Sequence, residues 1–99
     1  MEHFILELTC AACPEQYDVY LKDKKVGYLR LRHGVFRCDY PDCGDETIYK
    51  AYPKGDGMFE YEERHVYLQG ALAALANKLN IDDFNYEIKS DYEFPFDFS

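Results

Sequence analysis

The side chains best suited to chemistry are four cysteines, which form two pairs in the sequence. Cys10 and Cys13 are separated by two residues, the spacing of a metal-binding knuckle, and Cys38 and Cys43 form a looser pair with four residues between them. A zinc ribbon normally uses two tight knuckles, so the second pair departs from that pattern. We therefore expect ordinary reduced thiols and no cofactor.

A smaller zinc site is the alternative interpretation. In a sheet whose strands follow one another as a meander, the loop after the first strand and the turn at His33 lie at the same end. Cys10, Cys13 and His33 would then meet, with His3 as a further ligand. Cys38 would instead point into the core, where a free cysteine behaves as a small apolar residue.

The sequence contains no clear catalytic constellation. Serine occurs only at Ser90 and Ser99, which leaves no obvious Ser/His/Asp set. Cys10 or Cys13 with His33 resembles a Cys/His pair, but nothing nearby suggests an oxyanion hole. We expect a protein that is not an enzyme, and a small-ligand protein that uses this end of the sheet stays open as an alternative.

Composition predicts one acidic domain over residues 1–99. The 99 residues are 47% hydrophobic and carry a formal charge of −8. Residues 1–38 hold six Lys/Arg against five Asp/Glu, a net of +1, whereas residues 39–99 hold five against fourteen, a net of −9. The N-terminus lacks a signal peptide and no apolar run is long enough to span a bilayer, so we expect a cytoplasmic protein.

This charge distribution also indicates the class of partner. A chain with this charge repels nucleic acid and anionic membranes, and it is attracted to a basic protein surface. We expect no direct contact with nucleic acid or membrane, and a partner that is itself a nucleic-acid-binding protein.

Hydropathy patterns predict an α+β fold, with a meander-like antiparallel sheet of five or six strands and one long helix packed on one face. Alternating apolar residues indicate strands over residues 3–8, 16–22, 26–32, 35–40 and 46–52, and 85–89 is a candidate sixth strand. Residues 58–79 have a helical period, with Asp56 as the expected N-cap and His65 on the apolar stripe as a core histidine.

Three arginines lie on the predicted strands, on the face away from the apolar residues. A three-residue loop at 23–25 would place Asp18 opposite Arg30 and Gln16 opposite Arg32, and the next hairpin would place Arg37 opposite Arg30. We expect these charges to be neutralised within the protein, by Asp18 and by the acidic tail. If the arginines instead formed one continuous exposed positive surface, nucleic acid would be the expected ligand.

The last ten residues, 90–99, alternate mostly acidic with aromatic residues and contain no basic residue. They are expected to form an edge strand or a disordered segment that orders on a partner. Aromatic side chains anchor interfaces, so we predict a binding site from the acids before and within this segment and its aromatics: Asp82, Asp83, Asp91, Tyr92, Glu93, Phe94, Phe96, Asp97 and Phe98. Self-association through the sheet edge, giving a homodimer, is the alternative.

Three strings resemble small uncharacterised proteins of bacteria and their phages. They are Cys-Pro-Glu-Gln-Tyr-Asp-Val at 13–19, Val-Gly-Tyr-Leu-Arg-Leu-Arg-His-Gly at 26–34 and Lys-Gly-Asp-Gly-Met-Phe at 54–59. The resemblance covers residues 10 to about 79. It implies an inhibitor that occupies the nucleic-acid-binding groove of a host protein.

Overall fold

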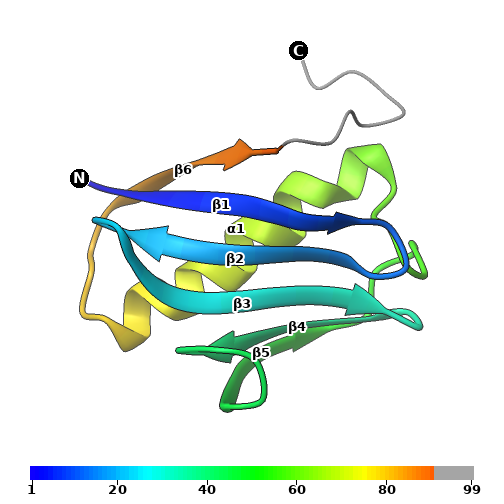
Figure 1. Cartoon of the computed structure of the whole chain (residues 1–99), viewed down its shortest axis with the longest axis horizontal. Coiled ribbons are helices and arrows are strands. Elements are labelled where there is room, and N and C mark those ends of the chain that lie inside the picture. The colour runs from blue at the N-terminus through cyan, green and yellow to red at the C-terminus, as the bar shows by residue number, and fades with distance from the viewer. Residues whose placement is uncertain (91–99) are drawn as a thin grey trace.

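The chain folds as an α+β domain in which one helix covers one face of a six-stranded sheet (Figure 1). The computed structural model describes residues 1–90. Within them the elements are β1 (Glu2–Ala11), β2 (Glu15–Leu21), β3 (Lys24–Arg32), β4 (Val35–Tyr40), β5 (Glu46–Ala51), α1 (Tyr61–Lys78) and β6 (Phe84–Lys89). The predicted fold class is confirmed.

The sheet has the strand order β5-β4-β3-β2-β1-β6. Strands β1 to β5 form the predicted antiparallel meander, but β6 pairs parallel to β1. Helix α1 begins beside β6, where His65 contacts Tyr86, and it ends beside β5, where Lys78 pairs with Glu46. It thereby returns the chain to the end of the sheet where β1 starts, and residues 79–83 lead from there to the start of β6 (Figure 1). A backbone hydrogen bond of 3.1 Å from the amide of Glu2 to the carbonyl of Asp83 joins the beginnings of β1 and β6.

The core lies between α1 and the face of the sheet that α1 covers. Alternate residues of the strands point towards the helix, as period-two patterning predicts. The buried apolar residues that form this layer include Phe4, Leu6, Leu8, Tyr17, Val19, Leu29, Leu31, Phe36 and Cys38 from the sheet and Leu68, Leu72 and Leu75 from α1. Burial raises the pKa of the Cys38 thiol to about 12, as befits a core residue.

The register of the β3–β4 hairpin is confirmed. Leu31 lies opposite Phe36, and Arg30 lies opposite Arg37. The turn between the strands has positive φ angles at both His33 and Gly34, as expected for a two-residue hairpin turn of the type that matches strand twist.

The predicted β2–β3 register is wrong by two residues. The hairpin turn is the two-residue Lys22-Asp23, with φ angles of 52° and 65°, and a bulge follows. Gln16 therefore lies opposite Arg30, and Asp18 lies opposite Tyr28. Because the shift is even, every side chain keeps its predicted face of the sheet.

Helix α1 begins later than predicted, and Asp56 is not its N-cap. Glu60 is the N-cap residue, and its amide donates to the carboxylate of Glu63 at 3.0 Å. The same carboxylate accepts from the amides of Lys54 at 2.9 Å and Gly55 at 2.8 Å. Glu63 thus satisfies one helix-terminal amide and fixes the loop that leads into α1.

Candidate binding surfaces

The Cys/His end of the sheet does not assemble a metal site in the described part of the chain. Cys13 and His33 do line one small pocket of about 200 Å³, as the topology predicted, together with Arg32, Asp56 and Gly57. Cys10 is outside that lining, and its thiol donates to the carbonyl of Ala12 at 3.4 Å. Within residues 1–90 no three His, Cys, Asp or Glu side chains are grouped to hold a metal, and all four cysteines are free. The zinc hypothesis therefore gains no support.

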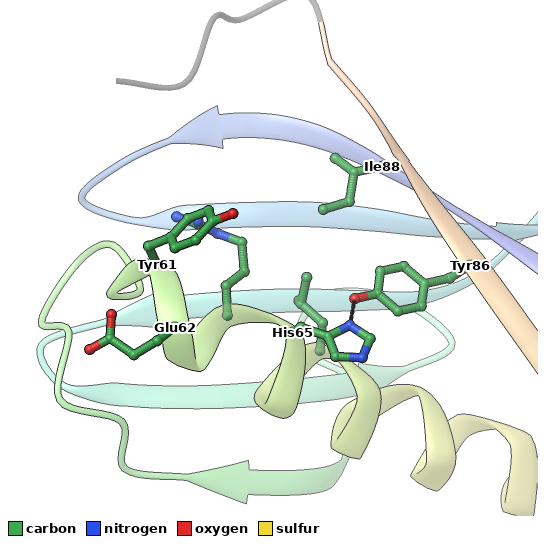
Figure 2. Close-up of a pocket in the computed structure, with 7 residues that line it drawn as sticks. Tyr61, Glu62, His65, Tyr86 and Ile88 are labelled. Carbon is green, nitrogen blue, oxygen red and sulfur yellow. Dashed lines mark hydrogen bonds between the residues drawn. The ribbon is translucent and has the colours of Figure 1, made fainter. Parts of the chain in front are cut away.

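A larger groove of about 370 Å³ opens between the N-terminal half of α1 and strand β6 (Figure 2). This volume lies within the usual range of ligand-binding clefts. Among residues 1–90, the side chains that line the groove come from these two elements, and they are Tyr61, Glu62, Arg64, His65, Leu68, Tyr86 and Ile88.

Arg64 in this groove is held by a buried carboxylate of β2. Its Nε donates to Glu15 Oε2 at 2.8 Å and its Nη2 donates to Glu15 Oε1 at 2.9 Å. The amide of Phe59, at 2.9 Å, and the hydroxyl of Tyr17 also donate to this carboxylate. With four donors in place, both oxygens of the Glu15 carboxylate are hydrogen-bonded, and the charge of Arg64 is compensated.

The rim of the groove is aromatic and acidic. Tyr61 is 50% exposed, and Glu62 beside it is also exposed. Further along α1, the Nδ1 of His65 shares a hydrogen bond of 2.5 Å with the hydroxyl of Tyr86, and the two rings stack (Figure 2). The prediction of a core histidine is wrong: His65 is exposed, and Arg64 occupies the buried position next to it.

The predicted acidic site is only partly within the described residues. Asp82 and Asp83 are exposed in the loop that precedes β6. Asp91, Tyr92, Glu93, Phe94, Phe96, Asp97 and Phe98 lie outside the described residues. The two parts are attached to opposite ends of β6. This strand is an edge of the sheet, and no strand among residues 1–90 pairs with its outer side.

Asp18 does not neutralise Arg30 as predicted, and the predicted contribution of the acidic tail lies outside the described residues. Asp18 binds Lys25 instead, with an N···O distance of 2.9 Å. Arg37 does have an acidic partner, Asp39, at 3.2 Å. The error follows from the register, because Gln16 and not Asp18 is the neighbour of Arg30 on β2.

The Glu15–Arg64 pair was not predicted from the sequence. The two residues are 49 positions apart, so no local pattern connects them. One signal was present: Glu15 continues the alternation of Tyr17 and Val19, which places an acid on the apolar face of β2. An acid at such a position requires a buried cationic partner.

Comparisons with protein-family models, with curated proteins and with solved structures found no match to this chain. Within residues 1–90, α1 is too polar to cross a bilayer. The site's own geometry is therefore the basis for assigning a function.

Proposed function

We propose that the protein is a non-enzymatic binding module that docks a basic segment of a partner protein along strand β6. The observation that carries the proposal is the groove beside β6, because its buried cation is already compensated while its rim is aromatic and acidic. An arginine or lysine side chain of the partner fits such a groove, with cation–π contacts to Tyr61 and Tyr86 and an ion pair to Glu62.

The surroundings of the groove support an extended partner segment. An unpaired edge strand accepts a further strand through main-chain hydrogen bonds, while pockets select side chains. The acids Asp82 and Asp83 precede β6, and residues 91–98, with their alternating acids and aromatics, follow it. A basic segment lying along β6 would thus meet the negative charge of Asp82 and Asp83 at the start of the strand.

The partner class we propose is a nucleic-acid-binding protein, because such proteins present basic grooves. The more specific proposal is that the protein is a phage-type inhibitor that occupies the basic nucleic-acid-binding groove of a host protein. The acidic charge of residues 39–99 would accelerate encounter with such a surface.

The test is affinity capture from a lysate of the source cells with three proteins. The site variant combines Glu62→Gln, Asp82→Asn and Asp83→Asn. The control variant combines Asp23→Asn, Asp45→Asn and Glu46→Gln, which removes the same charge from exposed positions away from β6.

We expect the affinity of the site variant for the captured basic partner to fall roughly 5- to 30-fold, since exposed ion pairs contribute up to about 1 kcal/mol each. The control variant is expected to bind nearly as wild type, and wild-type binding weakens as salt rises. Equal binding by both variants, or binding insensitive to salt, contradicts the proposal. A dimer in sedimentation that dissociates in the site variant would instead assign this edge to self-association.

A further inference from the structure

The face of the sheet that α1 leaves uncovered has a row of cations across three neighbouring strands. Arg30 of β3 lies opposite Arg37 of β4, and Arg37 lies opposite Lys50 of β5. Gln16 of β2 continues the row on the other side of Arg30. Adjacent strands are about 4.8 Å apart, so three positive side chains stand side by side on one surface.

Little within the described residues compensates this charge. Like charges directly opposite one another destabilise a sheet. Asp39 binds Arg37, but its carboxylate also accepts from the hydroxyl of Thr47 at 2.7 Å and the amide of Gly44 at 3.0 Å. The Nε of Arg30 is buried and has no acceptor among residues 1–90. Among residues 1–90, the row therefore retains an excess of positive charge and one buried donor without an acceptor.

Two further side chains extend the row towards one end of the sheet. Arg32 follows Arg30 by two residues, on the same side of β3, and is exposed. Tyr52 follows Lys50 by two residues and is 70% exposed. Pro53 favours an extended conformation at Tyr52, which would place its ring on the side of Lys50.

We propose that this surface, which we name the cationic row (Arg30, Arg32, Arg37 and Lys50), binds single-stranded nucleic acid. Guanidinium groups match phosphate oxygens in geometry and charge, and three of the four cations are arginines. An exposed tyrosine at the end of the row offers a stacking platform for a base, which an acidic peptide would not use in this way. The cationic row reaches the β5 edge, whereas the proposed protein-binding groove lies at the β6 edge, so the two proposals are independent.

The test is fluorescence anisotropy with labelled oligothymidylate of about 12 nucleotides, titrated with the full chain at several salt concentrations. The row variant is Arg30→Gln with Lys50→Gln. The matched control is Lys24→Gln with Lys54→Gln, two exposed lysines outside the row. Circular dichroism and thermal unfolding check that each variant is folded, and Tyr52→Ala tests stacking separately.

If each cation of the row contacts a phosphate, the logarithm of the binding constant falls against the logarithm of the salt concentration with a slope of about −3. The row variant is expected to bind at least tenfold more weakly at low salt, with a slope smaller in magnitude by about 1.4. Tyr52→Ala is expected to lose about fivefold or more. The control is expected to bind as wild type.

Three results overturn the proposal. The first is no binding of the oligonucleotide at low salt, and the second is an equal loss in the row variant and the control. The third is tighter binding of oligoglutamate or of duplex DNA than of the single strand, which would assign the surface to another class of ligand.

Discussion

At the scale of single residues, the buried pair of Glu15 and Arg64 determines the character of the groove. Both side chains are almost fully buried, at 0% and 2% exposure. A buried ion pair contributes little net stability compared with apolar packing, but removing one partner leaves the other charge uncompensated. The pair therefore fixes the position of the first turns of α1 against β2, and with it the position of Tyr61 and Glu62 at the rim.

The first prediction is that Arg64→Met destabilises the protein by about 3–5 kcal/mol, because Glu15 stays buried without its cation. For a domain of this size that is a large part of the total stability. Urea denaturation followed by circular dichroism measures the change. The double variant Glu15→Leu with Arg64→Met is expected to regain part of the loss. A cost below about 1 kcal/mol for Arg64→Met would contradict this account of the groove.

At the scale of elements, the strands and the helix could be predicted from periodicity, but their exact register and ends could not. The turn at His33-Gly34 contains a glycine, which marks a hairpin in the sequence. The turn at Lys22-Asp23 has no such marker, although both residues have positive φ. The bulge that follows has no sequence signal either, so the predicted partner of Asp18 on β3 is wrong by two residues.

The start of α1 illustrates the same limit. Asp56 has the side chain of a good N-cap, but Glu63 forms the hydrogen bonds that close the first turn. Burial opposes ionisation of Glu63, yet the three amides that bind it outweigh this effect and lower its pKa. Those amides belong to a loop whose path is fixed by tertiary packing, which explains why sequence patterns favoured the wrong residue.

The second prediction concerns the pH dependence of stability. A carboxylate whose pKa is lower in the folded state stabilises the fold above its unfolded pKa of about 4.3, and this contribution is lost as pH falls through the folded pKa. Glu63→Gln is therefore expected to reduce stability by about 1 kcal/mol at neutral pH and by less in acid. Denaturation midpoints of wild type and variant across this range measure it. A difference that stays constant down to the lowest pH would exclude Glu63 as the source.

At the scale of the whole molecule, the net charge is acidic but the charges are distributed unevenly over the surface. The helix and the core cover one face of the sheet and leave the other face exposed, and the strand order places β5 and β6 at opposite edges. The cationic row reaches one edge, and the acidic groove follows the other. Net charge alone predicted a basic partner and no nucleic acid. It could not predict the row, because the row depends on which residues the register brings together.

The groove between α1 and β6 could not be predicted from the sequence. The sequence predicts that acids and aromatics near β6 bind a partner, but no pattern in it indicates a role for the first turns of α1. Those turns face β6 because residues 52–60 carry the chain from the end of β5 to the β6 side of the sheet before α1 begins. Nonlocal topology of this kind is not encoded in any short motif.

The central claim, that the groove beside β6 receives a basic side chain of a partner, is tested most directly by a nuclear magnetic resonance titration. The isotope-labelled full chain is titrated at low salt with an arginine-rich peptide, with an oligoglutamate peptide as the control. We predict that the peptide shifts the signals of Tyr61, Glu62, His65 and Tyr86 together, and that salt or Glu62→Gln weakens the effect. Shifts confined to other surfaces, or none at these four residues, would contradict the account.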